Sequence, residues 1–196
     1  MTELEYDLTI FPDPVLRVRA ADVTAFDDAL ATTVRAMFAR MYLSHGVGLA
    51  APQVGLKIRL FVLNDTGEPG SGEELAFVNP TILSRGGAPT LFEEGCLSFP
   101  QIYAEVERPD GCRVRWQDLS GTVHERDFDG FVSRIIQHEY DHLEGVLLVD
   151  RMSPADKLRH RTALEELIED YKARTQPAVA RGPSWLPRKA GSKKRR

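Results

Sequence analysis

The clearest periodic pattern is a series of apolar residues near the N-terminal end that recur at spacings of three and four. Such spacing places one residue of each turn on the same side of a helix. It predicts an amphipathic helix from about Asp27 to Leu43, with Gly46 just beyond its end, because glycine commonly follows the last helical turn. The apolar positions are Phe26, Leu30, Val34, Met37, Phe38 and Met41.

Three later segments have the composition of short strands. Each is rich in β-branched or aromatic residues and is bounded by Gly, Pro, Asn or Asp, which predicts strands separated by turns. The segment GEPGSGEE at 67–74 predicts a loop between the first two. The predicted strands are IRLFVLN at 58–64, ELAFVNP at 74–80 and CRVRWQDL at 112–119.

The C-terminal half returns to helical spacing. A second helix is predicted over about Gly130–Leu143, with Gly145 placed to end it. A third is predicted to start at Ser153-Pro154, because serine caps helix starts and proline suits the first turn. Its apolar stripe consists of Leu158, Leu164, Leu167, Ile168 and Tyr171. Helix, several strands and then helices predict an α+β fold rather than alternating βαβ units.

Composition narrows the class of protein. The 196 residues are 42% hydrophobic and 28% charged, as in an ordinary globular domain. No apolar run reaches the roughly 20 residues of a membrane span, and the N-terminus lacks a basic region followed by an apolar stretch. Two cysteines are too few to staple a secreted scaffold. We therefore expect no membrane association and a reducing, cytoplasmic location.

Charge divides the chain into two parts. Residues 181–196 carry seven Lys or Arg and no acid, whereas the first 180 residues carry 18 Lys or Arg against 29 Asp or Glu. After Thr175 the sequence is rich in Pro, Ala and Arg and has no apolar periodicity. We predict one folded domain over residues 1–175 and a basic, disordered tail over 176–196.

The sharpest chemical feature is an H-E-x-x-H motif at 138–142, inside the second predicted helix. Residues four apart leave a helix about 40° apart, so His138 and His142 can bind one metal ion. Glu139 then lies beside the ion, where it can handle the protons of a water molecule. The competing interpretations are a solvated helix face and a structural zinc site.

A hydrolytic metal site usually has three protein ligands, so a third is needed. Cys112 alternates with other apolar residues of its strand and is better explained as a core residue. We expect His45, His124 and His160 to face solvent. Cys96 follows Gly95 in a segment without clean alternation, and spacing alone leaves its role open.

The segment GVGLAAPQ at 46–53 is a third candidate. Glycine-rich apolar backbone can lie flat against a ligand, and the Gln53 amide can donate to a developing oxyanion. The alternative is a tight turn with Gln53 exposed. The segment lacks the Gly and Lys pattern of a phosphate loop, so we expect no nucleotide cofactor.

The ordered segments GVGLAAPQ, EGCLS and QHEYDHLEG resemble the peptide deformylases, and the resemblance runs from about Tyr6 to Tyr171. It implies an α+β fold in which short antiparallel sheets pack around a central metal-binding helix, with a C-terminal helix. It implies three metal ligands, a catalytic glutamate and two oxyanion donors. These match Cys96, His138 and His142; Glu139; and the Gln53 side chain with the Leu97 backbone N–H.

The implied reaction removes the N-formyl group from the formylmethionine that begins nascent polypeptides, releasing formate. Attack by a metal-activated water is expected, with Glu139 carrying the proton to the leaving amine. The resemblance implies Fe²⁺ as the physiological ion. One thiolate and two imidazoles also suit Zn²⁺, Ni²⁺ or Co²⁺.

The resemblance also implies binding residues for the substrate. The methionine pocket would be formed by Val47, Phe92, Phe131 and Ile135, although ordinary core packing explains each of these equally well. The Gly48 backbone would bind the peptide main chain as an added strand. Glu94 and Arg108 match a buried ion pair that supports the cysteine loop.

Two other functions compete with this one. A general H-E-x-x-H metallopeptidase shares the helix motif, but Cys96 and Gln53 argue against it. A non-catalytic protein could use the metal as a structural staple and the basic tail to bind RNA. For the tail itself, the alternatives are a solubilising extension and a contact with ribosomal RNA near emerging substrate.

Overall fold

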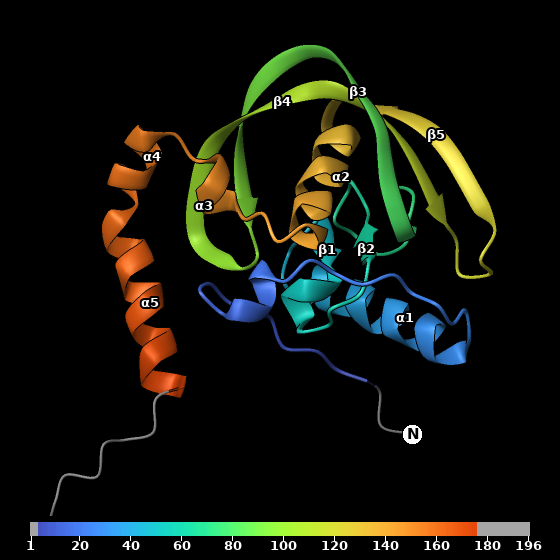
Figure 1. Cartoon of the computed structure of the whole chain (residues 1–196), viewed down its shortest axis with the longest axis horizontal. Coiled ribbons are helices and arrows are strands. Elements are labelled where there is room, and N and C mark those ends of the chain that lie inside the picture. The colour runs from blue at the N-terminus through green and yellow to red at the C-terminus, as the bar shows by residue number, and fades with distance from the viewer. Residues whose placement is uncertain (1–3, 176–196) are drawn as a thin grey trace, which may run out of the picture.

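The computed structural model describes residues 4–175. One five-stranded antiparallel sheet runs in the order β1-β2-β3-β4-β5. Its two long strands arch over helix α2, and helix α1 lies at the opposite end of the molecule (Figure 1). The strands are β1 (Gly48–Ala50), β2 (Leu60–Leu63), β3 (Leu75–Cys96), β4 (Phe99–Gln117) and β5 (Val123–Asp129).

The helices follow the predicted order with additions. Two short 3₁₀ turns are added in the N-terminal half, and the C-terminal helical region is divided into three pieces. The helical elements are η1 (Pro14–Arg17), α1 (Asp28–Leu43), η2 (Ala51–Val54), α2 (Gly130–Leu143), α3 (Leu148–Arg151), α4 (Pro154–Arg159) and α5 (Arg161–Thr175). The α+β prediction is confirmed.

Helix α1 begins where its sequence predicts, because the Asp27 side chain accepts a hydrogen bond from Leu30 N at 3.0 Å. It also ends at Leu43, as predicted, but the residue in the left-handed conformation is not Gly46. The left-handed residue is His45 (φ 55°), and Gly46 N donates to Met41 O at 2.9 Å to close the turn. Gly46 is required for another reason: a Cβ there would lie 2.8 Å from the Leu97 side chain.

Helix α2 has the predicted bounds and is the buried centre of the fold. Gly145 takes φ 72°, as expected of a residue that ends a helix. Gly145 also lies so close to Arg17 O that a Cβ would come within 2.6 Å of it. Residue 145 therefore has to be glycine, because of both its backbone conformation and the packing around it.

Strands β3 and β4 are much longer than the predicted segments at 74–80 and 112–119. The turn-like residues Gly86, Gly87 and Pro89 lie within the β3–β4 ladder, where the register shifts between Gly86 and Pro89. The strands continue to a two-residue turn at Leu97-Ser98, after which Cys96 pairs with Phe99. The segment that showed no clean alternation is thus the end of a hairpin.

The sequence did not predict strand β5. It also predicted the last helix as one piece. Within Val123–Asp129 only Phe128 is buried, so an exposed edge strand left little apolar signal. The predicted helix from 153 breaks at His160, which ends α4 and is half-buried rather than facing solvent. Leu158, expected on the buried stripe, is 72% exposed.

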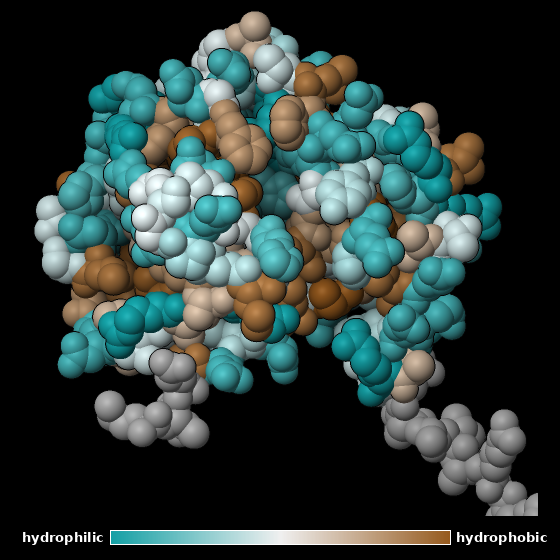
Figure 2. All heavy atoms as spheres, turned by 180° about the vertical axis from the view of Figure 1, so that it is seen from behind, coloured by the Kyte–Doolittle hydropathy of each residue, from teal (hydrophilic) through white to brown (hydrophobic). Residues whose placement is uncertain are grey.

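Three apolar clusters form the core. One surrounds α2 and includes Phe61, Phe77 and Ile136; another joins α1 to β1 and β2; the last joins the β3–β4 turn to η1 and α3. Seen from behind, brown apolar side chains gather across the lower middle of the surface, between teal regions (Figure 2). Helix α5 rests on the last cluster through Ala163, Leu164 and Leu167.

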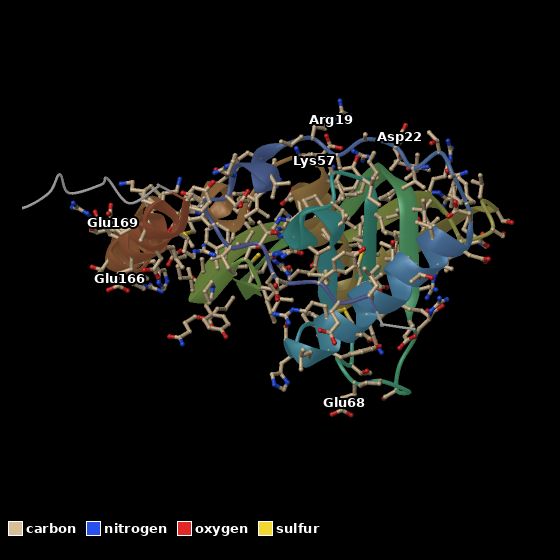
Figure 3. All side chains as sticks on the ribbon, turned by 90° about the horizontal axis from the view of Figure 1, so that it is seen from below. Arg19, Asp22, Lys57, Glu68, Glu166 and Glu169 are labelled. Carbon is tan, nitrogen blue, oxygen red and sulfur yellow. The ribbon has the colours of Figure 1, made fainter. Side chains whose placement is uncertain are left out.

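The outer side of α5 is charged, and Glu166 and Glu169 point away from the body (Figure 3). Within residues 4–175, no helix is both long and apolar enough to cross a membrane. The predicted basic tail, 176–196, lies outside the described residues.

Candidate active site

Three segments distant in sequence meet beside helix α2. The ligand atoms of Cys96, His138 and His142 lie within 4.8 Å of one another. Cys96 is supplied by the end of β3, and the two histidines by successive turns of α2. Cys96 Sγ is 3.3 Å from His142 Nε2. One thiol and two imidazoles that converge in this way can hold a single metal ion.

The other candidate ligands lie elsewhere. Cys112 is buried in the core, as predicted, and accepts a hydrogen bond from Ser133 Oγ at 3.3 Å. His45 and His124 are exposed, as predicted. Among the described residues, the group formed by Cys96, His138 and His142 is the cluster of at least three such side chains close enough to share an ion.

Glu94 fixes the orientation of one histidine. His138 Nδ1 lies 3.0 Å from Glu94 Oε2, which leaves the opposite ring nitrogen, Nε2, toward the cluster. Arg108 makes two hydrogen bonds to Glu94, of 2.7 and 2.9 Å, and a third to Asp141. Burial would raise the pKa of Glu94, but hydrogen bonds from His138 and Arg108 lower it to about 2. Glu94 is therefore ionised throughout the physiological range.

The two histidines differ in their affinity for protons when no ion is bound. Burial would lower the pKa of His138, but the neighbouring Cys96 and Glu94 raise it well above its usual value. Burial lowers the pKa of His142 well below its usual value, and the charge of His138 adds to this effect. Metal binding at this cluster therefore has to release a proton.

Glu139 is buried at 4% exposure, and desolvation raises its pKa to about 7. A carboxyl group with such a pKa can both accept and return a proton near neutral pH. Two buried atoms, Glu139 Oε2 and His142 Nδ1, have no hydrogen-bond partner within residues 4–175. A carboxylate oxygen left in this way is placed to meet a water molecule or substrate.

Gln53 is buried rather than exposed, and its amide is held in one orientation. Ala50 N donates to Gln53 Oε1 at 2.8 Å, so the Nε2 group points away, 3.6 Å from Cys96 Sγ and 3.4 Å from Ser98 Oγ. The donor end of the amide therefore lies beside the cysteine. Leu97, whose backbone N–H was the other predicted donor, follows Cys96 in the hairpin turn.

The segment before Gln53 packs directly on α2. A Cβ on Gly48 would lie 2.5 Å from Glu139 Oε1 and 2.8 Å from Ile135 Cγ2. Any larger residue would displace the carboxylate, so glycine here is a consequence of the close approach of β1 to the helix.

A cavity of about 610 Å³ opens onto this cluster. Its walls include every predicted pocket residue: Val47, Gly48, Phe92, Phe131 and Ile135. Ile135 is buried, whereas Phe92 and Phe131 are about half exposed, with ring centroids 5.9 Å apart. Two larger hollows of about 760 and 800 Å³ lie on other surfaces and contain none of the predicted ligands.

A model of the Polypeptide deformylase family matches residues 6–158 of the chain. The chain belongs to the peptide deformylase family. The match begins where the sequence resemblance was expected to begin and ends before α5. The enzyme is a hydrolase that removes the N-formyl group from nascent formylmethionyl polypeptides.

Individual relatives agree with this assignment. The deformylase is 46% identical over 167 residues to the peptide deformylase of Thermotoga neapolitana, covering 85% of this chain and 99% of the relative. It is 44% identical over 182 residues to peptide deformylase 1B, chloroplastic/mitochondrial, of Arabidopsis thaliana, covering 92% of this chain and 67% of the relative.

Solved structures are also similar. A crystal structure of plant peptide deformylase PDF1B superposes with a TM-score of 0.86 at 43% identity, covering 89% of this chain and 95% of the other. A peptide deformylase from Plasmodium falciparum gives 0.84 at 44% identity, covering 87% and 100%.

Sequence reasoning missed Asp141 as a contributor to the deformylase site, and placed Arg134 near the pocket without giving it a contact. Asp141, inside the H-E-x-x-H motif, is buried and accepts hydrogen bonds from Arg108 and Arg151. Arg134 is buried and donates to Glu94. The helical spacing of Phe131, Arg134, Ile135 and His138 would have placed Arg134 on the site-facing side of α2.

Proposed function

We propose that Cys96, His138 and His142 hold one divalent metal ion beside Glu139, and that this ion is Fe²⁺ in the cell. The observation that carries the proposal is the convergence of the three ligand atoms within 4.8 Å, next to a buried carboxyl group. The donor set also suits Zn²⁺, Ni²⁺ and Co²⁺, which could replace iron in purified protein. Family members are metal-dependent, which supports the assignment.

When bound, the ion would lower the pKa of a water molecule and polarise the formyl carbonyl. Glu139 accepts a proton from the water that attacks the formyl carbon. Gln53 Nε2 and Leu97 N–H donate hydrogen bonds to the formyl oxygen as it becomes negative. Glu139 then gives the proton to the leaving amine, so that the C–N bond breaks and formate is released.

The walls of the cavity explain how the substrate would be held. Val47, Phe92, Phe131 and Ile135 would surround the methionine side chain, and the Gly48 backbone would pair with the peptide main chain as an added strand. Glu94 and Arg108 would act indirectly, by holding His138 in its ligating orientation.

Anaerobic purification, metal analysis and a formate-release assay on one preparation test this proposal. We expect one Fe²⁺ per chain, formate release from formyl-Met peptides, and loss of activity in air because Fe²⁺ oxidises. Unformylated peptides should not be cleaved. Cleavage confined to unformylated peptides would support the general metallopeptidase instead. Iron would be ruled out if the purified enzyme held a different ion and kept its formate-release activity in air.

We also propose that the basic residues of 181–196 draw the enzyme to ribosomal RNA, and that the enzyme acts in the cytoplasm. Seven cations without an acid support this, since contacts with phosphate neutralise charge and weaken steeply with salt. Deleting 181–196 should abolish co-sedimentation with ribosomes at low salt while leaving formate release unchanged. Unchanged co-sedimentation would remove the proposal, and cell fractionation would test the location.

A further inference from the structure

Arg134 is a buried charge that the reaction does not use. It lies on α2 one turn before His138, is 7% exposed, and forms part of the cavity wall. A buried guanidinium is costly unless its donors are satisfied, so its partners indicate why it is there.

Neutralising Glu94 does not explain Arg134. Arg108 already makes a bidentate pair with Glu94, and His138 takes a further position on the same carboxylate. Arg134 contributes one more bond, from Nη1 to Glu94 Oε1 at 2.8 Å. Its remaining donors bind elsewhere, and those contacts distinguish it from Arg108.

Those contacts surround Phe92. Arg134 Nη2 donates to both the backbone oxygen and Oγ1 of Thr90, each at 2.8 Å, and Nη1 donates to Val106 O at 3.0 Å. Val106 is the residue paired with Phe92 across the β3–β4 ladder. The guanidinium carbon lies 5.3 Å from the centre of the Phe92 ring.

The three β3 side chains that Arg134 touches are consecutive on one face of the strand. Thr90, Phe92 and Glu94 are spaced by two, which places them on the same side of the sheet. Arg134 therefore spans this face and holds it at a fixed distance from α2. Phe92, half exposed at the mouth of the cavity, has the guanidinium beneath it and Phe131 beside it.

We infer that Arg134 is a specificity-determining positioning residue: it holds Phe92 against α2 and so fixes the width of the pocket that accepts the first side chain of the substrate. This inference rests on the proposed role of Phe92 in the methionine pocket. A planar fork satisfies Glu94, Thr90 and Val106 at once, which a lysine ammonium cannot do.

The test compares kcat and KM for formyl-Met and formyl-Ala peptides in Arg134→Met, Arg134→Lys and Arg113→Met variants. Arg113 is the matched control, because its ion pairs with Glu125 and Asp127 lie on the exposed side of β4. We expect both Arg134 variants to lose about tenfold in selectivity for formyl-Met, mainly through KM. The formyl-Ala peptide, which does not fill the pocket, should be affected little, and Arg113→Met should behave as wild type.

Equal losses on both peptides, or full rescue by Arg134→Lys, would overturn the inference, because Arg134 would then act through Glu94 or through its charge. Thr90→Val covers the case in which the Arg134 variants fail to fold: it removes one acceptor of Arg134 without touching Glu94, and should lower selectivity in the same direction. Unchanged selectivity in Thr90→Val would then overturn the inference.

Phe92→Ala distinguishes this inference from the proposed function. If Phe92→Ala leaves selectivity unchanged, the assignment of Phe92 to the methionine pocket fails, and the role of Arg134 fails with it. If Phe92→Ala lowers selectivity and the Arg134 variants do not, only the inference about Arg134 is wrong.

Discussion

Glu139→Gln should lower kcat for formate release by about 10³-fold while the bound metal and KM change little. The amide has almost the same shape as the carboxyl group but cannot carry a proton from water to the leaving amine. Glu139 is buried beside the three proposed metal ligands, so no solvent-exposed base can take its place. The measurement is steady-state formate release, with metal content determined on the same samples. Metal retained with kcat unchanged would exclude Glu139 as the proton carrier.

Metal-free Glu139→Gln should be more stable than the metal-free wild-type protein at neutral and alkaline pH. Burial raises the pKa of Glu139 to about 7 from its usual value of 4.5, so the folded state binds this proton more tightly than the unfolded state. The stabilisation is therefore fully present below pH 4.5 and is lost as the pH rises through 7. The Glu139→Gln variant has no carboxyl group at this position and would lack this loss. Urea unfolding of both metal-free proteins between pH 4.5 and about 8 should show a difference that grows to about pH 7 and then levels.

Cys96→Ser should lose the metal ion, and with it the formate-release activity. Supporting residues around metal ligands typically change affinity by about 10–100-fold, so loss of a ligand itself should exceed about 100-fold. A serine hydroxyl stays protonated at neutral pH, whereas a cysteine readily supplies the thiolate that binds metal. Metal content after gel filtration, followed by a titration with added metal, measures the effect.

Cys112→Ala is the matched control for Cys96→Ser. Cys112 is the other cysteine of the chain and is buried in the apolar core around α2. It contacts Ser133 rather than the proposed metal ligands. Its removal should cost about 1 kcal/mol of stability and leave metal content and kcat unchanged. If Cys96→Ser kept one ion per chain and full activity, Cys96 would not be a ligand.

The sequence predicted best where the signal is local. The bounds of α2 agree because a helical apolar pattern is ended by glycine at 145, and α1 begins at the capping Asp27. Local signals misled where a neighbouring strand compensates. The predicted strand stopped at Pro80, yet β3 continues to Cys96 because β4 carries the ladder onward through shifts in register. The break at His160 falls in a gap of six positions between Leu158 and Leu164 in the apolar stripe, which the prediction of one helix bridged.

The sequence by itself determined that His138 and His142 face the same way with Glu139 between them, because residues four apart on a helix are neighbours. It could not determine which residue completes the cluster, since spacing left Cys96 open. Folding decided this by placing the end of the β3–β4 hairpin, which carries Cys96, beside α2. Folding also fixed the direction of the Gln53 amide, through the hydrogen bond from Ala50 N–H.

Tertiary structure also decided the electrostatics of the site. Nothing local in the chain sets the pKa of Glu139 or Glu94: burial raises the first, and contacts with His138 and Arg108 lower the second. Arg134 reaches across 44 positions of sequence to Thr90 and 40 to Glu94. Such contacts depend on the arch of β3 and β4 over α2, and burial and long-range charge have no periodic signature in sequence.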